Sequence, residues 1–117
     1  TMAVVETISG GSIGQLMTAI GAQTYVGGRI YPLESLDLGD PAQLSLELAE
    51  KCMVDLAPDC TLSVVSDPAA GVTVATLYHP HGREEWTMGR SGRSKEMQDR
   101  IAILALEHVR RFLVETH

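Results

Sequence analysis

Apolar and polar positions along this chain follow two periods, and each period predicts a different kind of element. Apolar side chains recur three and four residues apart in three segments, which predicts amphipathic helices over residues 12–20, 40–56 and 94–115. Shorter apolar or alternating runs, bounded by glycine, proline or aspartate, predict strands over residues 3–6, 24–31, 61–66, 72–78 and 83–88.

Two boundaries are marked by residues with a clear physical role. Asp40-Pro41 predicts a helix start, because aspartate caps free amides and proline is accepted in the first turn. His79-Pro-His-Gly82 predicts the turn of a hairpin. We expect Trp86 to face inward and to pack across that hairpin against Tyr78 as a cross-strand pair.

The predicted order is strand, helix, strand, helix, three strands and a final helix. Strands mixed with helices over a single core predict an α/β fold: a three-layer-type sandwich with a mixed sheet, parallel at its centre and ending in an antiparallel edge hairpin. Residues 1–117 are expected to form one domain, with Thr1 an expression scar before Met2.

Composition narrows the classes of partner. The chain is 44% apolar and carries a formal net charge of −6. The negative charge argues against nucleic acid as the main partner, because its phosphates are bound mainly by basic side chains. No segment has the roughly 20 apolar residues of a membrane span, and no signal-peptide pattern opens the sequence, so we expect a cytoplasmic protein without a membrane partner. Cys52 and Cys60 are expected to be buried, reduced thiols, and neither a metal nor a cofactor is expected.

The segment after the first predicted strand carries the candidate chemistry. A β-branched run ends at Glu6, hydroxyl residues and glycines follow, and the helical pattern starts at Ser12. Such a strand-to-helix turn exposes unpaired amides at the positive end of a helix, which favours an anion or a developing oxyanion. Helix capping by the hydroxyls and a sharp turn at Gly10 and Gly11 remain the structural alternative.

This pattern resembles the C-terminal domain of the competence/damage-inducible protein CinA, which also occurs alone as nicotinamide mononucleotide deamidase. Val5-Glu-Thr-Ile-Ser-Gly-Gly11 stands where that family has Ala-Glu-Ser-Cys-Thr-Gly-Gly. Tyr25-Val-Gly-Gly28 and Tyr31-Pro-Leu-Glu34 follow at close to the family distances, and the loop at residues 89–93 looks like the family Gly-Asp-Arg element before its final helix. The resemblance covers nearly the whole chain.

The resemblance implies roles for particular residues in hydrolysis of a carboxamide. Thr7 falls on the family nucleophile, with Ser9 as an alternative and Tyr31 on the family tyrosine. The amides of Gly10, Gly11 and Ser12 would hold the oxyanion. Arg90 and Arg93 would contact a phosphate of a small anionic, nucleotide-like ligand, since paired arginines suit that group.

Departures from the family pattern weaken that chemistry. Threonine replaces the nucleophilic serine, and its methyl group restricts the rotamer. Leu36 and Asp37 stand where the family has a lysine, and the aspartate of Gly-Asp-Arg is missing before Arg93. Loss of one member of a catalytic unit commonly costs several powers of ten in rate. We therefore expect weakened or lost catalysis.

Three functions stay open on the sequence: a surviving amidohydrolase, a non-catalytic module that binds a nucleotide or anion, and an interaction protein. The last follows from the missing N-terminal helix of the family, which would leave part of the sheet for another subunit to cover. A homo-oligomer is expected for this reason.

Overall fold

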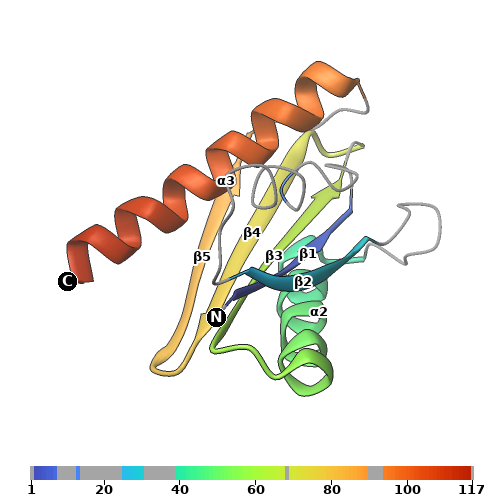
Figure 1. Ribbon diagram of the computed structural model, residues 1–117. Coiled ribbons are helices and arrows are strands. Elements are labelled where there is room, and N and C mark those ends of the chain that lie inside the picture. Colours follow the sequence, from blue (N-terminus) through green and yellow to red (C-terminus); the bar gives the residue numbers. More distant parts are fainter. Residues whose placement is uncertain are drawn as a thin grey trace.

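The computed structural model describes residues 2–7, 13, 25–30, 39–67, 69–89 and 94–116. Within these ranges the chain forms five strands and two long helices (Figure 1). In chain order they are β1 (Met2–Glu6), β2 (Tyr25–Ile30), α2 (Pro41–Leu56), β3 (Cys60–Asp67), β4 (Val72–His79), β5 (Gly82–Met88) and α3 (Lys95–Thr116). The predicted helix over residues 12–20 lies outside the described residues except at Ile13, which is helical.

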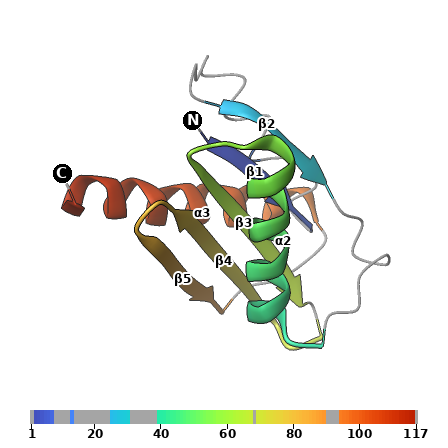
Figure 2. The same ribbon diagram turned by 90° about the horizontal axis from the view of Figure 1, so that it is seen from below.

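The strands form one mixed sheet in the order β2-β1-β3-β4-β5. Strand β1 runs parallel to both of its neighbours, whereas β3, β4 and β5 are successively antiparallel. Helices α2 and α3 lie on opposite faces of this sheet (Figure 2). The α/β sandwich with a parallel centre and an antiparallel edge hairpin is therefore confirmed.

The face of the sheet under α3 carries the main apolar core. Large side chains from the central strands, including Val4, Leu62, Val64 and Leu77, pack there against Ile13 and against one stripe of α3. That stripe consists of Ile101, Ala102, Ala105 and Val109. Successive residues of a strand point to opposite faces of the sheet, so the strand residues that alternate with this core point toward α2.

The opposite face is more polar. Ala3 and Val5 pack against Cys52 of α2, and hydroxyl side chains occupy much of the remaining interface. The Ser45 hydroxyl lies 3.2 Å from the main-chain oxygen of Ser63 and 2.9 Å from Oγ1 of Thr76. Burial raises the pKa of the Cys52 thiol above its usual value, although the neighbouring Thr61 hydroxyl works in the opposite direction.

Local capping sets where the helices begin. Asp40 caps α2 by accepting a hydrogen bond from the Ala42 amide at 3.0 Å, as Asp40-Pro41 predicted. Ser94 does the same for α3, accepting from the Met97 amide at 3.1 Å. Cys52 and Cys60 are free thiols, the first buried and the second only partly so. No helix in the described ranges is both long and apolar enough to cross a bilayer.

The predicted pairing of Tyr78 with Trp86 is wrong. In the β4–β5 ladder Tyr78 lies opposite Arg83, and Trp86 lies opposite Ala75. The two-residue turn pairs His79 with Gly82 and so sets this register. Tyr78 and Trp86 consequently point to opposite faces of the sheet, and Trp86 stacks on His108 of α3 instead.

Candidate functional site

The sheet brings the ends of four strands to one edge. Because β1, β2 and β3 are parallel and β5 runs in the same direction as β3, all four have their carboxyl ends there. From β1 the chain passes to β2 on one side, and β3 then pairs on the other side. This is a topological switch point, where open α/β sheets usually bind their ligands.

Every site residue predicted from the sequence follows one of these carboxyl ends. Thr7 directly follows β1 and is described by the structure. The other predicted residues lie outside the described residues: Ser9, Gly10, Gly11 and Ser12 after β1, Tyr31 after β2, and Arg90 and Arg93 after β5.

Thr7 is 4% exposed, and its polar groups bond to the main chain of β3. Its amide donates to the carbonyl of Val64 at 3.2 Å. Its hydroxyl donates to the same carbonyl at 3.2 Å and accepts from the amide of Ser66 at 3.1 Å. Thr7 therefore extends the β1–β3 pairing by one residue with a side chain that stands in for main-chain groups.

A second pair of hydroxyls continues this buried region toward β4. Ser66 and Thr73 lie opposite each other in the β3–β4 ladder, and their side-chain oxygens are 2.7 Å apart. Both residues are completely buried. The switch point is thus lined on its β3 side by hydroxyls that bond to each other and to the backbone.

Glu6 also lies at this edge, although it is not among the site residues predicted from the sequence. It is 3% exposed, and its carboxylate accepts a hydrogen bond from the Ile13 amide at 2.8 Å. The bond ties the last residue of β1 to Ile13, which is helical, and a carboxylate is a favourable acceptor for a helical amide without a main-chain partner. The sequence does contain a signal for this role, because Glu6 is a charged residue at the end of an otherwise apolar strand, and a buried charge needs a partner.

Among the described residues, the Thr7 hydroxyl has none of the partners of an activated nucleophile. A hydroxyl that attacks a carbonyl needs a base within about 3.2 Å to take its proton. Within the described part of the chain, both hydrogen bonds of the Thr7 hydroxyl go to main-chain groups of β3. In the same ranges, no three His, Cys, Asp or Glu side chains gather as metal ligands would.

Comparison with known proteins identifies the fold. No family model and no curated protein matches the sequence. Solved structures do match. A CinA superfamily protein from Klebsiella pneumoniae has a TM-score of 0.80 at 12% identity, over 97% of this chain and 87% of that one.

Two further solved structures agree. A competence or damage-inducible protein from Enterobacter asburiae gives a TM-score of 0.76 at 16% identity, over 92% of this chain and 84% of that one. A competence/damage-inducible protein from Agrobacterium tumefaciens gives a TM-score of 0.72 at 16% identity, over 93% of this chain and 82% of that one. This chain therefore has the fold of the CinA superfamily proteins, as the resemblance implied.

Proposed function

We propose that this CinA-like domain is related to the nicotinamide mononucleotide amidohydrolases, that its hydrolytic activity is weakened or lost, and that it still binds a small anionic, nucleotide-like ligand. The ligand would lie at the carboxyl edge of the sheet, beside the turn after β1. The hydrogen bonding of the Thr7 hydroxyl is the observation that carries the proposal.

That hydroxyl is poorly suited to attack a carboxamide. Its proton points to a carbonyl oxygen, which is a very weak base, and its lone pair accepts from the Ser66 amide. Attack would first require both buried bonds to break. With leucine and aspartate at residues 36 and 37 instead of the family lysine, the sequence offers no replacement for the missing base there.

Binding of an anion needs positive charge and a fixed site but no catalytic base, and this chain retains residues suited to both needs. The Glu6–Ile13 hydrogen bond holds Ile13 against the end of β1, which supports a preorganised site there. Arg90 and Arg93 follow β5 in the sequence, and they would supply positive charge for a phosphate. Together these features support an anion site without an active nucleophile.

The loss of hydrolysis is tested by incubating the protein with nicotinamide mononucleotide and measuring released ammonia. We expect no more ammonia from the unaltered protein than from Thr7→Ala. Release that depends on Thr7 would show that catalysis survives. The same comparison with Ser9→Ala separates the two hydroxyls that the sequence offers.

Binding is tested separately by thermal shift with a panel of nucleoside monophosphates. A ligand at a hundred times its Kd stabilises the folded state by about 2.7 kcal/mol. We expect this stabilisation to fall in the double variant Arg90→Ala/Arg93→Ala and to persist in Arg110→Ala, which removes a charge far along α3. A flat response across the panel would refute the binding part of the proposal.

A further inference from the structure

A cavity of about 220 Å³ lies between β5 and the second half of α3. It is lined by Glu84 and Trp86 of β5 and by His108, Arg111 and Phe112 of α3. About seven waters would fill this volume, which is the size of a small metabolite. The lining combines aromatic rings, one carboxylate and one guanidinium.

The aromatic rings are held in place by contacts between the strand and the helix. The Trp86 and His108 rings are stacked, with centroids 5.3 Å apart and planes 14° from parallel. Phe112 packs against the ring of His79, with centroids 5.0 Å apart. These rings form part of the cavity wall, where they could contact the apolar part of a ligand that also carries polar groups.

The carboxylate of Glu84 is held in place by the neighbouring strand. His79 of β4 donates from Nε2 to Glu84 Oε2 at 3.1 Å, while His79 Nδ1 accepts from the His81 amide at 3.3 Å. Glu84 thus receives a hydrogen bond that fixes its position beside the cavity.

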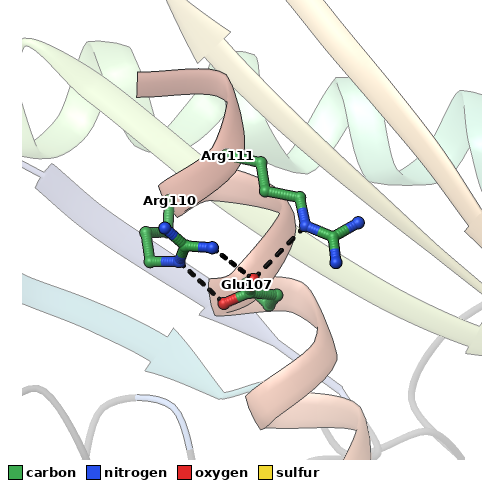
Figure 3. Close-up of polar contacts among 3 residues, drawn as sticks. All are labelled: Glu107, Arg110 and Arg111. Atoms are coloured by element: carbon green, nitrogen blue, oxygen red, sulfur yellow. Dashed lines mark hydrogen bonds and ion pairs between the residues drawn. The ribbon is translucent and has the colours of Figure 1, made fainter. Parts of the chain in front are cut away.

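The positive charge comes from a group of three residues on α3 (Figure 3). Glu107 accepts two hydrogen bonds from Arg110, at 2.9 and 2.6 Å, and one from Nε of Arg111 at 3.3 Å. One carboxylate therefore serves two guanidinium groups, which leaves one net positive charge. The two terminal nitrogens of Arg111 point away from Glu107 in Figure 3, and Arg111 lines the cavity.

Glu84 and Arg111 line the same cavity without forming an ion pair with each other; among the described residues, Glu84 contacts His79 and Arg111 contacts Glu107. Opposite charges that share a small cavity but stay apart are complementary to a molecule that carries both charges. The carboxylate of such a molecule would bind Arg111, its ammonium group would bind Glu84, and its apolar part would lie against the rings.

We propose that this cavity binds a free α-amino acid with a medium-sized apolar side chain. The site is separate from the one proposed at the end of β1. Glu6, Val64, Ala75 and Trp86 form one row across the sheet, so Trp86 lies three strand spacings, or about 14 Å, from Glu6. Either site can thus fail its test without affecting the other.

Trp86 is the single tryptophan of the chain, so its fluorescence reports directly on the cavity. Leucine is the probe, and two analogues each lack one charge: leucinamide has no carboxylate, and 4-methylpentanoate has no ammonium group. We expect leucine to change the Trp86 emission saturably. Both analogues should bind at least about tenfold more weakly, because each loses a hydrogen bond between charged groups.

Two pairs of variants distinguish the cavity from general charge effects. Arg111→Ala and Glu84→Gln should each weaken leucine binding about tenfold or more. Arg100→Ala removes an exposed charge from α3, and Glu85→Gln removes an exposed carboxylate from the neighbouring position of β5, yet neither residue lines the cavity. Both should bind leucine within about twofold of the unaltered protein, as expected for charges outside the site.

The proposal is overturned by any of three results. The first is the absence of a saturable fluorescence change with leucine. The second is binding of leucinamide or 4-methylpentanoate as tight as that of leucine. The third is an equal loss of binding in Arg100→Ala and Arg111→Ala, since that would assign the effect to the overall charge of α3.

Discussion

Replacing Thr7 by valine tests whether its hydroxyl is a structural group. Valine keeps the shape of threonine but removes both hydrogen bonds of the hydroxyl with β3. The Val64 carbonyl keeps its bond from the Thr7 amide, whereas the buried Ser66 amide is left without its acceptor. An unpaired buried donor costs about 1–3 kcal/mol, so we expect Thr7→Val to lower the free energy of unfolding by about 2 kcal/mol.

The assay is thermal and urea unfolding followed by circular dichroism. At about 4 °C per kcal/mol for a chain of this size, Tm should fall by about 8 °C. Thr7→Ser retains the hydroxyl and loses one methyl group, so its loss should be about 1 kcal/mol. Thr87→Val, at an exposed position of β5, is the matched control and should change stability by less than about 0.5 kcal/mol. If Thr7→Val were as stable as the control, the hydroxyl would not be a structural anchor.

Three further predictions concern other parts of the molecule. Ser45→Ala removes the polar link between α2 and the sheet and should lower the free energy of unfolding by about 1–2 kcal/mol in urea titrations. Hydrogen bonds from Arg110 lower the pKa of Glu107 from 4.5 to about 2, so this pair stabilises the fold above pH 4.5 and its contribution disappears as the pH falls toward 2. Carboxyl NMR titration should show that midpoint, and Arg110→Ala should raise it. Burial raises the pKa of both thiols, so both should react slowly with iodoacetamide. The half-buried Cys60 should nevertheless be alkylated faster than the buried Cys52, because the reagent reaches it more easily, and mass spectrometry would reveal the difference.

Local signals in the sequence were sufficient to predict most of the helices and strands of the described residues. Asp40 capped α2 where aspartate followed by proline predicted it, and the apolar runs became the central strands. The pairing of Tyr78 with Trp86 failed because side-chain direction in a hairpin depends on the register. A two-residue turn at Pro80 and His81 places these two side chains on opposite faces.

The contacts of the candidate site were much harder to predict. The partners of Thr7, Val64 and Ser66, lie 57 and 59 residues away in sequence and become neighbours only when β1 pairs with β3. No periodicity in the sequence encodes that register. Glu6 was more accessible to prediction, since a carboxylate in a buried strand requires a partner, yet only the structure identifies the Ile13 amide as that partner.

Stability and catalysis place different demands on the hydroxyl after β1. The strand β1 ends at Glu6, and the amide and side chain of Thr7 continue the pairing with β3 by one residue. This contribution needs a hydroxyl but no neighbouring base. Loss of a catalytic lysine would therefore leave the fold unaffected, whereas loss of the hydroxyl would destabilise it. A hydroxyl residue at this position is consequently expected even in a domain that no longer hydrolyses a substrate, so a hydroxyl here by itself is no evidence of activity.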